Sequence, residues 1–176
     1  TGDSELDRVL GGGLVPGSVS LLVGEPGIGK STLLLTLAGT QAVHGSVVYV
    51  SGEETVGQIA RRATRLGIAT DQLELIASQS LESVAATLPS RSPRLVIVDS
   101  VQTMGVSSLP NPLGSVVQIR EVTLELGRLA RQLGVPVVLV GHVTKDGDVA
   151  GPKLLEHLVD AVLLLEGDRT HDLRLL

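Results

Sequence analysis

Short apolar runs alternate with longer amphipathic stretches along this chain. The runs that predict strands lie at residues 19–23, 46–51, 73–76, 95–98, 137–140 and 161–165. Nearly every position in them is apolar, a pattern typical of parallel strands that are buried on both faces. Residues 171–176 have the pattern of a further strand.

The stretches between these runs predict helices. We expect helices at residues 30–43, 54–66, 81–88 and 115–133. Residues 56, 59, 63 and 66 are apolar, a spacing that places them on one helix face. Gly134 and Pro136 mark the end of the longest helix. The alternation predicts an α/β fold, a mainly parallel central sheet with helices on both faces.

The composition narrows the class of protein. Its 176 residues suit a single domain, so we expect one domain over residues 1–176. With 43% hydrophobic and 19% charged residues, the sequence is not typical of a disordered protein. It has no cysteine for a disulfide or a thiolate site. No run is long enough to span a membrane, so we expect a cytoplasmic protein without a membrane partner. The net charge of −5 argues against a surface broadly committed to nucleic acid.

Residues 24–31 match the phosphate-binding pattern G-x-x-x-x-G-K-[ST] between a predicted strand and a predicted helix. The glycines let backbone amides form an anion-binding nest, and the helix N-terminus adds its dipole. Lys30 would lie between the β- and γ-phosphates, Ser31 would bind Mg²⁺, and Thr32 would reach the α-phosphate. The predicted nucleotide-binding residues are Gly24, Glu25, Pro26, Gly27, Ile28, Gly29, Lys30, Ser31 and Thr32.

Polar residues follow three of the predicted strands. Asp99 would assist Ser31 in holding Mg²⁺, or it would only cap a turn. Glu53 and Glu54 follow the strand at 46–51, which we expect to neighbour the strand at 19–23. Glu53 would orient or deprotonate the attacking water, with Glu54 in support, or both would only charge a helix N-terminus. His142 would contact the γ-phosphate, although a lone histidine is more often structural.

Several segments together carry a family resemblance. They lie at residues 1–13, 24–31, 49–54, 98–103, 114–121, 140–147 and 150–157, and the last two are the most specific. Over essentially its whole length, the chain resembles the RecA-like ATPase core of the bacterial RadA (Sms) family of DNA repair and recombination proteins. The resemblance implies a RecA-like P-loop NTPase fold, with ATP and Mg²⁺ as cofactors.

The resemblance also implies an activity and partners. Family members are ATP-dependent motors that form a ring, expected to be a hexamer, on single-stranded DNA and promote branch migration. It supports Glu53 as the catalytic residue that activates water and His142 as the γ-phosphate sensor, and it suggests recombinase or replication proteins as partners. Members usually carry an N-terminal four-cysteine zinc finger, a Lys-Asn-Arg-Phe-Gly motif and a C-terminal Lon-protease-like domain. We expect residues 1–176 to contain none of these.

The predicted DNA contacts follow from the lack of aromatic residues. Tyr49 is the only aromatic side chain and lies in a predicted strand, which nearly excludes base stacking. We expect loops 102–114 and 144–153 to contact the DNA backbone instead. The first loop has no positive charge and would offer backbone amides and shape, or be disordered without DNA. Lys145 and Lys153 in the second are the predicted DNA-binding residues, unless they are ordinary surface lysines.

Two questions stay open at this stage. Arg61, Arg62 and Arg65 form either a solvated helix face or, through one of them, a stacking partner for adenine. The leading function is a DNA-dependent ATPase motor core. The alternatives are a KaiC-type regulatory ATPase switch that binds proteins instead of DNA, and a nucleotide-binding assembly module with negligible hydrolysis.

Overall fold

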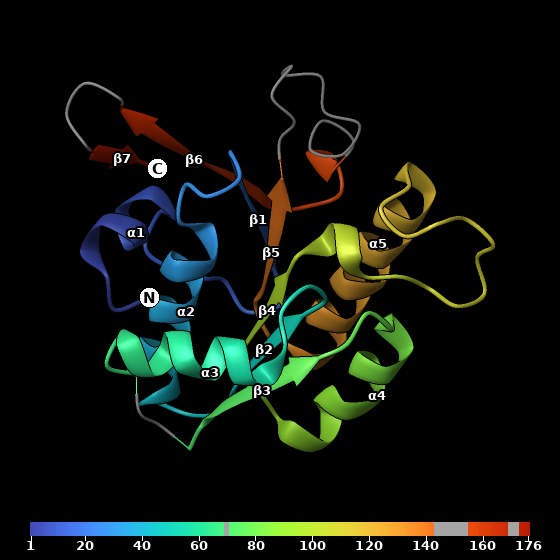
Figure 1. Cartoon of the computed structure of the whole chain (residues 1–176), viewed down its shortest axis with the longest axis horizontal. Helices are drawn as coiled ribbons and strands as arrows, with labels where there is room; N and C mark the ends of the chain where they lie inside the picture. The colour runs from blue at the N-terminus through green and yellow to red at the C-terminus, as the bar shows by residue number, and fades with distance from the viewer. Residues whose placement is uncertain (69–70, 143–154, 169–172) are drawn as a thin grey trace.

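A mainly parallel sheet organises the molecule. A computed structural model describes residues 1–68, 71–142, 155–168 and 173–176. Its strands are β1 (Val19–Gly24), β2 (Val47–Ser51), β3 (Leu73–Ala77), β4 (Leu95–Asp99), β5 (Val137–His142), β6 (Ala161–Asp168) and β7 (Leu173–Leu175). They lie in the order β3-β2-β4-β5-β1-β6-β7 (Figure 1). Every neighbouring pair is parallel except the antiparallel pair β6–β7. The predicted sheet type is thus confirmed.

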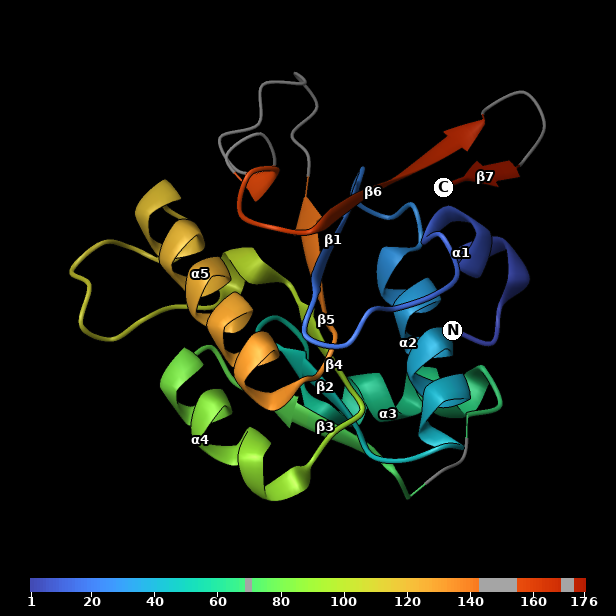
Figure 2. The same ribbon diagram turned by 180° about the vertical axis from the view of Figure 1, so that it is seen from behind.

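Helices cover both faces of the sheet, as predicted (Figures 1 and 2). On one face lie α1 (Ser4–Val9), α2 (Lys30–Ala42) and α3 (Val56–Arg65), and on the other lie η1 (Val101–Thr103), α4 (Leu81–Arg91) and α5 (Val116–Leu133). Alternate residues of each strand supply the two apolar cores. In β2, Val48 and Val50 pack in the α4–α5 core, whereas Tyr49 packs in the α2–α3 core.

Local signals explain where the helices begin and end. The Thr55 hydroxyl accepts a hydrogen bond from the Gln58 amide and forms a capping box at the start of α3. Ser115 caps α5, and Gly134 ends it in the left-handed conformation with φ 66°. The short helix α1 was not predicted. Asp3 caps it by accepting hydrogen bonds from the first two amides that follow Ser4.

One expectation about the sheet is wrong. The strand before Glu53 was expected to neighbour the P-loop strand, but β4 and β5 lie between β2 and β1. An apolar pattern shows that a strand is buried and does not encode which strand lies beside it. Glu53 is still brought to the site, because Ser51 at the end of β2 pairs in register with Asp99 at the end of β4.

No helix in the part of the chain that the structure describes is long and apolar enough to cross a membrane.

Candidate functional site

The P-loop joins β1 to α2 at the carboxyl edge of the sheet, where open parallel sheets bind their ligands. Gly27 and Gly29 have φ angles of 80° and 112°, which an L-residue rarely adopts. Gly24 is also required, because a Cβ there would lie 2.5 Å from the Leu165 carbonyl oxygen. The predicted role of the glycines in shaping the loop therefore agrees with the backbone geometry.

Lys30 begins α2 and is buried, with 4% of its surface exposed. Its Nζ donates hydrogen bonds to the carbonyl oxygens of Gly24 at 2.7 Å and Glu25 at 3.0 Å. Burial lowers the pKa of this ammonium group, and the carboxylates of Asp99 and Glu53 oppose that shift. The loop thus holds a buried cation over its own carbonyl groups, beside the nest that would receive a phosphate.

Ser31, Glu53, Asp99 and His142, four of the predicted site residues, line one cavity of about 250 Å³. Its lining consists of Ser31, Ser51, Glu53, Glu54, Arg62, Asp99 and His142. Asp99 is 7% exposed, and one carboxylate oxygen accepts a 2.6 Å hydrogen bond from the Tyr49 hydroxyl. Burial raises the pKa of Tyr49, with the Asp99 charge adding to the shift, so the phenol stays a donor. An acid from β4 and a hydroxyl from α2 thus meet in one pocket.

Glu53 lies at the mouth of this cavity. Its side chain is 51% exposed, and Oε1 accepts a 3.0 Å hydrogen bond from Ser100 Oγ. The Ser51 hydroxyl accepts hydrogen bonds from the amides of Glu53 and Glu54 and so fixes the turn between β2 and α3. His142 Nε2 lies 3.6 Å from Glu53 Oε1. The carboxylate can therefore reach a solvent molecule while Ser100 holds its other side.

His142 ends β5 and faces Glu53 across the cavity. Its Nδ1 is buried and has no hydrogen-bond partner among the residues that the structure describes. The Gln102 side-chain amide donates to its backbone carbonyl oxygen at 3.5 Å and so links η1 to the end of β5. The position fits the predicted contact with a terminal phosphate.

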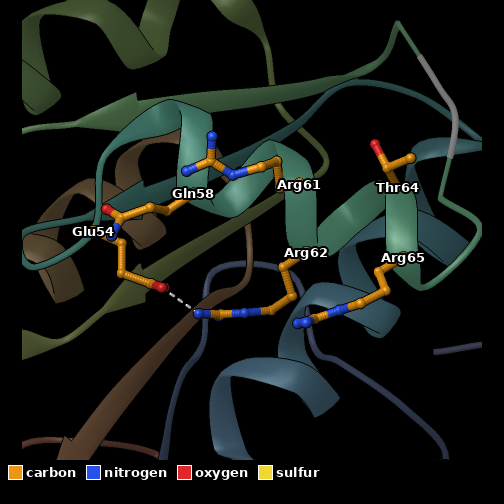
Figure 3. Close-up of a pocket in the computed structure, with 6 residues that line it drawn as sticks. All are labelled: Glu54, Gln58, Arg61, Arg62, Thr64 and Arg65. Carbon is orange, nitrogen blue, oxygen red and sulfur yellow. Dashed lines mark hydrogen bonds and ion pairs between the residues drawn. The ribbon is translucent and has the colours of Figure 1, made fainter.

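A second cavity of about 620 Å³ lies along α3. Glu54, Gln58, Arg61, Arg62, Thr64 and Arg65 line it (Figure 3). Arg62 forms an ion pair with Glu54, and both residues also line the first cavity. The pair is therefore the wall between the two cavities. The guanidinium groups of Arg62 and Arg65 point to the same side of α3, whereas Arg61 points away from them (Figure 3).

Part of the loop at residues 102–114 is anchored to the rest of the chain by hydrogen bonds from its backbone amides. The Val106 amide donates to Gln118 Oε1 at 2.8 Å, and the Ser107 amide donates to Glu82 Oε1 at 2.7 Å. Gln118 is 2% exposed, and its Nε2 donates to three carbonyl oxygens of the loop. Two amides that were expected to face DNA are thus already bonded within the chain. Lys145 and Lys153, the predicted DNA-binding residues, lie outside the described residues.

Three residues near the site have contacts that the sequence does not predict. The sequence indicates only that Tyr49 is buried. In the sheet, Ser51 of β2 lies opposite Asp99 of β4, so Tyr49, two residues before Ser51, is a diagonal neighbour of Asp99. Ser100 follows Asp99 directly and holds Glu53. Arg174 in β7 lies against Gly29 of the P-loop, and no local sequence signal connects the two.

Comparison with known proteins identifies the family of the chain. Residues 2–148 match the AAA domain family. DNA repair protein RadA of Mycobacterium tuberculosis (strain CDC 1551 / Oshkosh) is 53% identical over 99% of this chain and 37% of its own length. The RadA proteins of Bacillus subtilis (strain 168) and Escherichia coli (strain K12) are 49% and 48% identical, over 98% and 96% of this chain and 38% and 36% of their own lengths.

The chain thus spans less than two-fifths of the length of these relatives. A crystal structure of the RadB recombinase has the same fold, with a TM-score of 0.72 and 24% identity over 98% of this chain and 85% of that one. The resemblance to RadA that the sequence indicates is confirmed. The chain belongs to the AAA domain family and has the RecA-like α/β fold, with DNA repair protein RadA among its relatives.

Proposed function

We propose that this chain is the ATPase core of a DNA repair and recombination motor, acting as one domain over residues 1–176. The observation that carries the proposal is the 250 Å³ cavity, where Ser31, Asp99 and Glu53 meet beside the P-loop. The names of the RadA relatives support the role in DNA repair.

The residues of the cavity fit a magnesium ion that is shared with a nucleotide. Asp99 and Ser31 would hold Mg²⁺, directly or through water. No group of three or more His, Cys, Asp or Glu side chains that could hold a metal occurs among the described residues. Phosphate oxygens and water would therefore complete the shell, as Mg²⁺ prefers. When bound, Mg²⁺ neutralises the negative charge of the phosphates.

The side chains divide the work of hydrolysis. Lys30 Nζ would exchange its bonds to loop carbonyls for contacts with the β- and γ-phosphates, and loop amides would hold the phosphates in place. Glu53, oriented by Ser100, would position a water molecule for in-line attack on the γ-phosphorus and accept its proton. His142 would contact the γ-phosphate and lose that contact after hydrolysis.

The finer proposal concerns DNA. We propose that the motor acts on single-stranded DNA as a ring, expected to be a hexamer, and drives branch migration, with Lys145 and Lys153 on the phosphate backbone. Recombinase or replication proteins would be further partners. Backbone contact is supported by the burial of Tyr49, the only aromatic residue in the sequence, which leaves no ring for base stacking.

The test is the ATPase rate of the chain, and of a form extended through a Lys-Asn-Arg-Phe-Gly motif, with and without single-stranded DNA. We expect Mg²⁺-dependent turnover that DNA stimulates, DNA binding that weakens with salt, and a ring mass in solution. Hydrolysis without DNA stimulation or salt-dependent binding would favour the KaiC-type switch. Nucleotide binding without turnover would favour the assembly module.

A further inference from the structure

Arg174 places a second cation on the P-loop. Its Nε, Cζ and Nη1 lie 3.6, 3.6 and 3.7 Å from the point where a Cβ on Gly29 would lie. Because three atoms of the planar group are almost equally far from that point, the guanidinium group rests with its face on the loop. Gly29 permits this approach, since it has no side chain to displace the arginine. The N–H edges of the group are then directed along the loop surface.

The β6–β7 hairpin is what carries Arg174 to this position. Arg174 pairs in register with Gly167 of β6. A Cβ at Gly167 would lie 2.9 Å from the Ile28 side chain, so β6 packs closely against the P-loop as well. Two consecutive P-loop residues thus contact two paired residues of the hairpin. Ile28 lies against Gly167, and Gly29 lies against Arg174. In Figures 1 and 2 the hairpin lies beside α1 and the start of α2.

The sheet order shows which end of a nucleotide would meet this arginine. β1 lies between β5 and β6. The cavity with Asp99, Glu53 and His142 is formed by strands on the β5 side of β1, so the γ-phosphate would point that way. The α-phosphate and nucleoside would extend toward the hairpin on the other side. Arg174 therefore lies at the α-phosphate end of the loop.

The two cations of the P-loop region, Lys30 and Arg174, differ in burial and in bonding. Lys30 is buried and bonded to loop carbonyls, whereas Arg174 is exposed and has no ion-pair partner among the described residues. We propose that Arg174 binds the α- and β-phosphates of the nucleotide in its own P-loop. This inference rests on the proposed nucleotide binding and adds a residue to it. A guanidinium group suits the task because its fixed N–H donors match phosphate oxygens.

The arginines of α3 do not suit this position. Arg62 is paired with Glu54 (Figure 3). Helix α3 packs over β3, at the end of the sheet opposite β7. Arg62 lines the cavity on the γ-phosphate side, so the structure favours Arg174 over the arginines of α3 at the α-phosphate end of the nucleotide.

The test compares ligand binding by Arg174→Gln, Arg174→Lys and a control, Arg128→Gln, which removes an exposed charge from α5. The probes are ATP with Mg²⁺ and inorganic tripolyphosphate with Mg²⁺, measured by calorimetry at low ionic strength. We expect Arg174→Gln to weaken the binding of both probes about 5- to 10-fold. The loss is smaller than that of a buried hydrogen bond to a charged group, because Arg174 is exposed. Arg174→Lys keeps the charge but not the fixed donors, so it should recover only part of the loss, and Arg128→Gln should match the wild type.

Three other outcomes would overturn either the role of Arg174 or the proposed nucleotide binding. If the wild type binds ATP and Arg174→Gln binds it equally well, the phosphate role of Arg174 is wrong while nucleotide binding stands. If Arg174→Lys is as weak as Arg174→Gln for ATP and tripolyphosphate binding is unchanged, the arginine supports the base instead, and the phosphate assignment fails. If the wild type binds neither probe, the proposed function fails first. Far-UV circular dichroism of each variant shows that the fold is retained.

Discussion

Replacing Tyr49 with phenylalanine isolates the contact that holds the predicted magnesium ligand. The change keeps the buried ring and removes only the hydroxyl that donates to Asp99 at 2.6 Å. Tyr49 is fully buried and Asp99 is 7% exposed, so bulk water screens this bond poorly. We expect Tyr49→Phe to destabilise the fold and to leave the Asp99 carboxylate less firmly held.

The magnitude follows from the kind of bond that is lost. A hydrogen bond to a charged group contributes about 1.5–3 kcal/mol to stability. Asp99 lines the 250 Å³ cavity, so water there can replace part of the lost donor, and we expect a loss of about 2 kcal/mol. For a domain of this size, that corresponds to a fall in Tm of about 4–8 °C. The midpoint of urea unfolding should fall by about 1 M.

The assay is urea unfolding followed by far-UV circular dichroism, because the chain has no tryptophan and its only tyrosine is the residue that is changed. Asp99→Asn provides the control background, since an amide oxygen still accepts the bond but carries no charge. Tyr49→Phe should cost about half as much free energy there. A loss below about 0.5 kcal/mol, or an equal loss in both backgrounds, would refute a charge-assisted bond between these groups.

Three further expectations concern the cavity and the neighbouring loop. Glu53→Gln should reduce ATP turnover about 100-fold or more while ATP affinity stays within a few-fold, and Glu54→Gln should reduce turnover less. Equal turnover by the wild type and Glu53→Gln in a phosphate-release assay would contradict the role of Glu53 as the base. Gln118→Leu leaves the loop carbonyls and the Val106 amide without their buried partner. Amide hydrogen exchange across residues 106–111 should therefore accelerate at least tenfold, and unchanged exchange would exclude Gln118 as the anchor of the loop. Hydrogen bonds from the amide of Glu82 itself and from Ser107 lower the pKa of the Glu82 carboxyl group to about 2. The contribution of Glu82 to stability is therefore complete above pH 4.5 and is lost only as the pH falls toward 2. An NMR titration of this carboxyl group with a midpoint near 4.5 would contradict the expectation.

The sequence pattern was sufficient for the elements and for most of the cavity. Apolar runs are determined by burial, and every predicted strand lies in the sheet. Ser31, Asp99, Glu53 and His142 converge because the carboxyl ends of parallel strands share one edge, whatever the order of the strands. This is why the sequence could indicate that these side chains lie together, although β4 and β5 separate β2 from β1.

What could not be predicted depends on pairing between distant segments. The Tyr49–Asp99 bond requires the register of β2 against β4, which an apolar pattern leaves open. The contact of Arg174 with Gly29 requires the antiparallel pairing of β6 with β7, two strands that lie far along the chain from the P-loop. Helix α1 is only six residues long, too short for a periodic pattern to be recognised, and Asp3 supplies its cap.

The structure of loop 102–114 restricts how the proposed motor could hold DNA. The amides of Val106 and Ser107 are bonded to Gln118 and Glu82, and the low pKa of Glu82 keeps that carboxylate charged at any physiological pH. A phosphate that approached these amides would have to displace a carboxylate and meet its negative charge. DNA contact through these two amides therefore requires a rearrangement that breaks both anchors. If backbone binding occurs without that rearrangement, it cannot use these two amides, and we expect the lysines at 145 and 153 to contribute more of it. Measuring DNA binding by Gln118→Leu separates these two modes of contact. Loosening the loop should strengthen DNA binding only if the rearranged loop itself contacts DNA.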